Sequence, residues 1–170
     1  MRFLAVIGGV AIAIAIAAAV YFFGGFYNVA ATEEIAPVAW VLAHVRAASI
    51  DRHATQGAPL SLDDPALVRA GAHEFATLGC LSCHGGPGVK WAKFTEGMQP
   101  YPPDLKDIVN DREPRQLFWV VKNGIKMTAM PSFGAIGVGD PEIWSIVAFL
   151  KKLPTVTGDD FKTWIAGAGS

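Results

Sequence analysis

The residues with the most specific chemistry in this 170-residue chain are consecutive: Cys80-Leu81-Ser82-Cys83-His84. A Cys-x-x-Cys-His run is the sequence pattern of covalent haem attachment. Two thiols three positions apart can each form a thioether with a vinyl group of one porphyrin, and the adjacent histidine can bind the iron from one face. The run therefore predicts that Cys80 and Cys83 hold a haem c and that His84 is its proximal iron ligand.

Other interpretations of this run explain less. A structural zinc site takes four ligands, but the chain has only two cysteines, and His44, His53 and His73 lie at the wrong spacings. A thioredoxin-type dithiol is expected next to a strand–helix–strand pattern, which the sequence does not indicate. A disulfide between Cys80 and Cys83 is the remaining alternative, and it would leave His84 without a role.

A second motif, Met127-Thr128-Ala129-Met130-Pro131-Ser132-Phe133, offers a ligand for the other face of the iron. A low-spin electron carrier needs a sixth ligand, and a thioether raises the reduction potential. A methionine alone means little because methionines usually fill cores. Here one precedes a proline between two expected short helices, so Met127 and Met130 are the two candidate distal ligands.

Further residues are expected to support the haem. A haem-ligating histidine commonly donates its other ring N–H to a backbone carbonyl. Pro87, in the turn Gly85-Gly86-Pro87-Gly88, is the predicted acceptor, although the segment can also be a plain turn. The predicted neighbours of the haem propionates are Trp91, Trp119 and Arg115.

Composition bounds the organisation that positions these residues. The length suits one domain plus an appendage. The 52% apolar content is high for a soluble domain, and most of the excess lies in the first thirty residues. A formal net charge of −1 argues against nucleic-acid binding, which favours a clustered basic face. The sequence contains no evident repeat, so one haem is expected.

The N-terminal segment 1–31 is predicted to be a transmembrane anchor. Residues 3–26 carry no charge, and as a helix they would extend about 36 Å, enough to cross a hydrocarbon core of about 30 Å. Val29-Ala30-Ala31 could alternatively end a cleaved signal peptide. Arg2 precedes the span and Glu33 follows it, so the positive-inside rule predicts a cytoplasmic N-terminus and an exported remainder.

The rest of the chain is predicted to be helical. Residues 32–62 are expected to form an amphipathic helix and a linker, with Val38, Val41, Leu42 and Val45 as an apolar stripe for a membrane surface or a partner. Residues 63–155 should form the haem domain. Its first helix starts at Asp64-Pro65 and stops before Cys80, a short helix covers 113–122, and the last begins at Asp140. Residues 156–170 are expected to be a tail.

From residue 64 to residue 154 this order of parts resembles a class I monohaem cytochrome c. The resemblance implies an all-α fold, with the N-terminal transmembrane helix added to a small helical domain around one covalent haem. The Met-Pro motif of that family implies Met130 as the distal ligand, with Met127 as the rival. The family's first and last helices cross closely, and the matching contact here would place Gly71 and Phe75 against Trp144 and Leu150.

With its anchor the chain looks like the membrane-anchored bacterial cytochromes c, which act alone or as subunits of respiratory or dehydrogenase complexes. The resemblance implies a single-pass protein of the bacterial inner membrane whose haem domain faces the periplasm. It implies an electron carrier, not itself an enzyme, with membrane-embedded redox complexes as donor and acceptor. The alternatives are a haem enzyme or gas sensor with an open sixth iron position, and a mainly structural haem subunit. A mildly basic rim could steer an acidic partner; it contains Lys90, Lys93, Lys106, Arg112, Arg115, Lys122 and Lys126.

Overall fold

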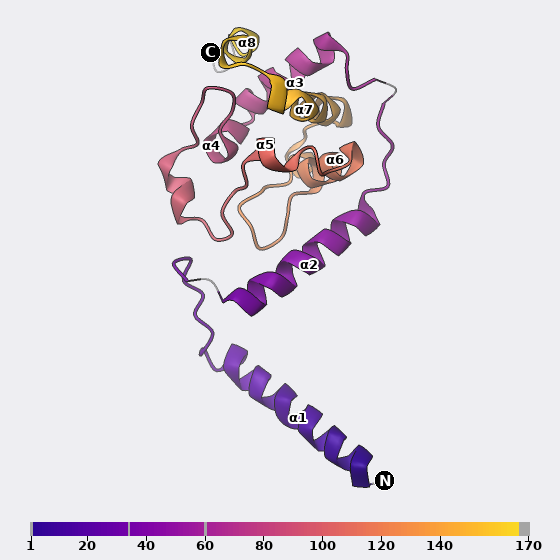
Figure 1. The fold of residues 1–170 in the computed structure, drawn as a ribbon, viewed down its shortest axis with the longest axis vertical. Coiled ribbons are helices and arrows are strands. Elements are labelled where there is room, and N and C mark those ends of the chain that lie inside the picture. The colour runs from indigo at the N-terminus through magenta and orange to yellow at the C-terminus, as the bar shows by residue number, and fades with distance from the viewer. Residues whose placement is uncertain (1, 34, 60, 167–170) are drawn as a thin grey trace. The chain divides into compact units, whose positions relative to one another are not determined.

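The computed structural model describes residues 2–33, 35–59 and 61–166. All helices and turns of regular secondary structure named in those ranges are α or 3₁₀ helices, and those ranges contain no named strand (Figure 1). The all-α prediction is confirmed. The chain divides into two compact units, residues 1–34 and 35–170. The first holds α1 (Arg2–Phe23). The second holds α2 (Ala36–His53), α3 (Pro65–Thr77), α4 (Cys80–His84), α5 (Leu105–Ile108), α6 (Pro114–Asn123), α7 (Asp140–Lys152) and α8 (Gly158–Trp164), with the short 3₁₀ turns η1 (Lys93–Gly97), η2 (Gly134–Ile136) and η3 (Leu153–Thr155).

Helix α1 has the properties of a membrane span. Its 22 residues are apolar apart from Arg2, and none of its side chains is buried. At this length it extends about 33 Å, close to the thickness of a hydrocarbon core. Among the described residues it is the single helix long and apolar enough to cross a bilayer.

Helix α3 leads directly into the Cys-His run. It begins where the sequence predicts: the Asp64 carboxylate accepts a hydrogen bond from the Ala66 N–H at 2.8 Å, and Pro65 is the first helical residue. It ends before Gly79, whose φ of +81° lies in the left-handed region that glycine adopts without strain. This residue turns the chain so that α4 starts at Cys80 at once.

Helices α3 and α7 cross in close contact at Gly71. A side chain at Gly71 would overlap the carbonyl group of Ser145, so only glycine permits this separation. One turn further along, the rings of Phe75 and Phe149 pack with centroids 5.3 Å apart. The predicted crossing is present.

The predicted partners in that crossing are wrong. Gly71 meets the backbone of Ser145, and Phe75 meets Phe149, where the sequence analysis expected Trp144 and Leu150. Trp144 instead stacks on Phe118 of α6, with ring centroids 4.2 Å apart. Residues five apart on a helix point about 140° away from each other, so Trp144 and Phe149 serve two different neighbours of α7.

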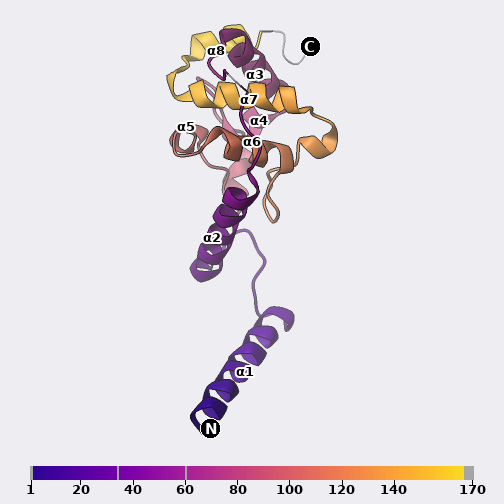
Figure 2. The same cartoon turned by 90° about the vertical axis from the view of Figure 1, so that its right-hand side faces the viewer.

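The predicted C-terminal tail 156–170 contains a packed helix. Helix α8 is capped by Thr157, whose hydroxyl accepts a hydrogen bond from the Asp160 N–H at 3.1 Å. Phe161 is fully buried and stacks on Phe149 at 5.4 Å. In Figures 1 and 2, α8 lies beside α3. The haem domain therefore extends to α8, because Phe161 completes its aromatic core.

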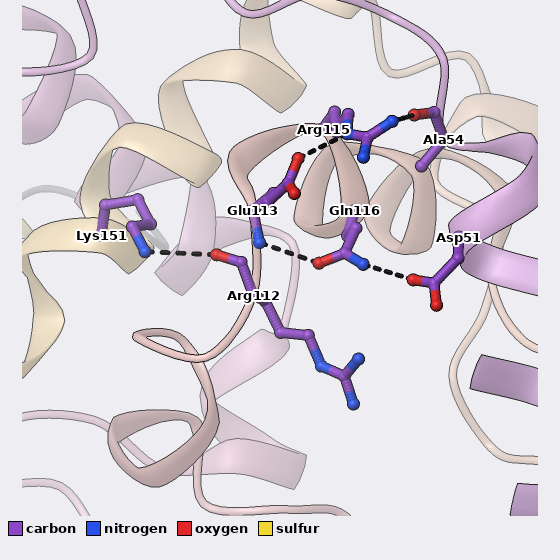
Figure 3. A network of polar contacts seen from close by, with 7 residues as sticks. All are labelled: Asp51, Ala54, Arg112, Glu113, Arg115, Gln116 and Lys151. Carbon is purple, nitrogen blue, oxygen red and sulfur yellow. Dashed lines mark hydrogen bonds and ion pairs between the residues drawn. The ribbon is translucent and has the colours of Figure 1, made fainter. Parts of the chain in front are cut away.

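Helix α2 belongs to the same compact unit as the haem domain, whereas the sequence analysis separates the two at residue 63. Its last turn buries Ile50, and Ala54 directly after it is buried too. Gln116 donates a hydrogen bond to Asp51, and the Arg115 guanidinium donates to the Ala54 carbonyl at 3.2 Å (Figure 3). These contacts attach the C-terminal end of α2 to α6.

The close crossing predicts the effect of a single methyl group. Gly71→Ala should lower the free energy of unfolding by about 1–3 kcal/mol, because the added Cβ forces the two backbones apart. Denaturant unfolding of the haem-loaded protein measures it. Gly57→Ala is the control, since that position is open space, and it should change stability by less than about 1 kcal/mol. Equal unfolding midpoints for the two variants would contradict the crossing.

Candidate haem site

The Cys-x-x-Cys-His run forms a single helical turn, α4, of five residues. Residues three apart on a helix lie on the same face, so Cys80 and Cys83 share one face with His84 directly after them. Both cysteines are free thiols and are partly buried. Burial raises the pKa of the Cys80 thiol to about 12, so this thiol stays protonated at neutral pH. In the structure Cys80 and Cys83 do not form a disulfide with each other.

His84 is held by a hydrogen bond to the backbone. Its Nδ1 lies 3.0 Å from the carbonyl oxygen of Pro103. Because a carbonyl oxygen only accepts, Nδ1 is assigned as the donor, and Nε2 is left free to bind iron. Burial lowers the pKa of His84, which favours the neutral imidazole that metal ions require.

The predicted acceptor, Pro87, is therefore wrong. Pro87 lies in a turn closed by two backbone hydrogen bonds between Gly86 and Val89, of 2.9 and 3.0 Å. Its neighbour Gly88 packs against Gly158 at the start of α8. The turn thus serves the contact with α8, and the extended segment that ends at Pro103 supplies the carbonyl for His84.

Two flanking contacts position the Pro103 carbonyl. The next residue, Asp104, caps α5 by accepting a hydrogen bond from the Lys106 N–H at 2.9 Å. At the other end of α5, the Lys151 ammonium group donates to the Val109 carbonyl at 2.7 Å. Sequence analysis missed α5, although an aspartate before Leu105 is a helix-capping signal.

Burial distinguishes the two candidate distal ligands. Met127 is 78% exposed and has a φ of +61°, whereas Met130 is partly buried and packs against the core. The Met130 carbonyl accepts a hydrogen bond from the Ile125 N–H at 3.2 Å, and its own N–H donates to the Thr128 hydroxyl at 3.1 Å. The structure favours Met130, and its role as iron ligand stays a prediction.

The loop that carries Met130 is attached to the end of α6. The Ser132 hydroxyl donates to the Lys122 carbonyl at 2.7 Å, and the Phe133 N–H donates to the Val121 carbonyl at 3.2 Å. Gly124 lies so close to the backbone of Pro131 that a Cβ there would be 2.7 Å away. This loop is therefore held in place by α6 without the haem.

The three predicted propionate neighbours are separated in the structure. Trp91 lines a cavity with His84 and packs edge-on against Tyr101. Arg115 pairs with Glu113 at 2.6 Å and reaches the α2 backbone, while Trp119 lies 6.2 Å from the ring of His53. Arg115 and Trp119 thus belong to the contact with α2, and only Trp91 is placed beside the ligand His84.

The cavity beside His84 has a volume of about 470 Å³, and five of its eleven lining residues are charged. Cys80, Cys83 and Met130 do not line it, so it covers the proximal side of the site and not the whole space a haem would take. The charged residues that line it are Lys90, Lys93, Lys106, Glu96 and Asp104.

These residues fit a covalent haem. The α4 turn offers two free thiols on one face, the orientation of His84 is set by Pro103, and a half-buried thioether is available. The zinc alternative is not supported, because residues 2–33, 35–59 and 61–166 contain no cluster of three or more His, Cys, Asp or Glu side chains able to hold a metal ion.

Comparison with protein families agrees with this geometry. A family model described as cytochrome c oxidase, cbb3-type, subunit III, matches residues 66–150. The chain belongs to this family of cytochrome c domains. The match runs from α3 to α7 and contains both the Cys-x-x-Cys-His turn and Met130. No curated protein and no solved structure matches the chain. The resemblance to a class I monohaem cytochrome c is confirmed.

A bound haem c supplies one-electron chemistry, in which the iron cycles between the ferric and ferrous states. The chain's own residues determine how that chemistry can be used. Cys80 and Cys83 would hold the porphyrin, and His84 would meet the iron in an orientation set by Pro103. The Pro103 carbonyl makes the imidazole more basic by accepting a hydrogen bond from its Nδ1–H.

The burial difference between the methionines predicts which one binds iron. Met130→Ala should abolish the weak near-infrared charge-transfer band of a thioether-ligated ferric haem and lower the reduction potential, because a thioether favours the ferrous state. Met127→Ala, the matched control one turn away, should leave both unchanged. If the band survived in Met130→Ala and vanished in Met127→Ala, the assignment would be reversed.

Proposed function

We propose that the protein is a monohaem electron carrier tethered to the bacterial inner membrane, with its haem domain in the periplasm. The observation that supports this proposal is that two residues able to bind iron are held by the fold: His84 by its hydrogen bond to Pro103, and Met130 on a loop attached to α6. We assign them to the two faces of the iron. With both positions filled, the iron has no open site for a substrate. It is then limited to accepting and passing on single electrons.

The tether suits partners in the same bilayer. Helix α1 has the length and composition of a span, and Arg2 at its start favours a cytoplasmic N-terminus. Confining the haem domain near the membrane raises its effective concentration at membrane-embedded donors and acceptors. The matching family is named after an oxidase subunit, and we infer that respiratory or dehydrogenase complexes are the partners of this chain too.

The rim of the cavity beside His84 supports the choice of partner charge. Lys90, Lys93 and Lys106 face it together with Glu96 and Asp104, an excess of one positive charge. Opposite charges across an interface mainly increase the association rate and are screened by salt. We infer that an acidic surface of the electron donor or acceptor approaches this rim.

The proposal predicts the stoichiometry and the electron count. The full-length protein should contain one iron per chain, keep its haem after denaturation, and titrate as a single one-electron wave. The variant Cys80→Ala/Cys83→Ala should release its haem on denaturation, because no thioether remains. A second wave, or haem lost from the unchanged protein, would contradict a single covalent haem.

A further inference from the structure

Helix α2 has two apolar faces at opposite ends, not the single amphipathic face that the sequence predicts. Near its C-terminus, Ile50 and the following Ala54 are 8% and 1% exposed and pack into the haem domain. Near its N-terminus, Val41, Leu42 and Val45 are exposed to solvent, while Val38 is partly buried. We call Val38, Val41, Leu42 and Val45 the outer stripe.

The outer stripe points away from the haem domain. Val41 and Ile50 are nine residues apart, or about two and a half helical turns, so they lie on opposite sides of α2. Val41 is 49% exposed, Val45 is 61% exposed, and the adjacent Trp40 is 63% exposed. The haem domain therefore does not cover this stripe.

The charge pattern of α2 resembles that of a helix at a membrane surface. Residues 35–45 contain no Asp, Glu, Lys or Arg, and the charged residues of α2 are Arg46, Asp51 and Arg52. Arg52 is eleven residues after Val41, about three turns, and so lies on the same side as the outer stripe. Exposed apolar side chains with a tryptophan, flanked by arginine, suit the boundary between acyl chains and anionic headgroups.

The connection to α1 identifies the occupant of this stripe. Residues 24–35, twelve in number, separate α1 from α2, and even fully extended they span only about 40 Å. The apolar end of α2 is the end that this connection joins. The outer stripe is therefore close enough along the chain to reach a bilayer that holds α1.

We propose that the outer stripe of α2 rests in the interfacial layer of the bilayer that holds α1, with Arg52 at the lipid headgroups. This inference rests on the proposed membrane anchor and adds a second point of membrane contact. Two points of contact restrict the rotation of the haem domain, which a flexible tether alone would leave free.

The orientation can be transmitted because α2 is clamped to α6 (Figure 3). Gln116 donates to the Asp51 carboxylate, and its side-chain oxygen accepts the Glu113 N–H at 2.8 Å. The Arg115 guanidinium donates to the Glu113 carboxylate at 2.6 Å and to the Ala54 carbonyl at 3.2 Å. Contact of α2 with lipid therefore sets how the haem domain faces the membrane.

Site-directed nitroxide labelling tests this inference on the full-length, haem-loaded protein. Cys80 and Cys83 are consumed by the thioethers, so one added cysteine is the only reactive thiol. Val41→Cys and Val45→Cys report on the outer stripe, and Ile12→Cys reports on α1. Lys162→Cys is the water-exposed control; it lies on α8, on the side of the haem domain away from the start of α2 in Figure 1.

The labelled proteins are placed in vesicles of phosphatidylcholine and phosphatidylglycerol in equal parts, with the haem reduced. Collision rates with lipid-soluble oxygen and with a water-soluble nickel chelate are then compared. The oxygen-to-nickel ratio should be several-fold higher at residues 41 and 45 than at residue 162, and high at residue 12.

Three results would overturn the inference. If residues 41 and 45 matched residue 162 while residue 12 favoured oxygen, the anchor would hold and the stripe would be in water, free for a partner protein. Low collision rates with both reagents at 41 and 45 would indicate a second copy of the chain covering the stripe. A water-exposed residue 12 would overturn the proposed anchor itself, and the inference with it.

Discussion

The close crossing of α3 and α7 at Gly71 is the constraint on which the haem site depends. Helix α3 runs through Gly79 into the Cys80–His84 turn, so the position of α3 sets the position of the haem thiols and the proximal histidine. Helix α7 stacks Trp144 on Phe118 of α6, and the end of α6 holds the Met130 loop. One backbone contact thus links the segments that carry the two proposed axial ligands, His84 and Met130, which are far apart in the chain.

Helix α7 has a second role on the proximal side. Lys151, in its last turn, donates a hydrogen bond to the Val109 carbonyl at the end of α5. The N-cap of α5, Asp104, directly follows Pro103, whose carbonyl accepts the hydrogen bond from His84. The orientation of the imidazole therefore depends on the same helix that positions the distal loop. The segments that carry both proposed ligands are preorganised by packing, which would suit an electron carrier because little would have to move when the iron changes charge.

Local signals in the sequence predicted the parts whose structure is locally determined. The Cys-x-x-Cys-His spacing, the Asp64-Pro65 start of α3 and the uncharged segment of α1 each depend on neighbouring residues, and each is found as expected. The errors concern choices that only tertiary contacts decide. Pro87 and Pro103 both offer a carbonyl, and nothing in the neighbouring sequence indicates which one accepts the hydrogen bond from His84. The sequence places Phe161 in a tail because its burial depends on stacking against Phe149, a contact that no local pattern indicates.

The central claim is that protein ligands fill both axial positions of one haem. Carbon monoxide binding to the reduced, full-length protein tests it most directly, because the gas needs a vacant iron position. The account predicts that the spectrum of the ferrous protein does not change when carbon monoxide is added. Rapid and stoichiometric binding would contradict it, since the sixth position would then be open and the protein would belong with haem enzymes or gas sensors.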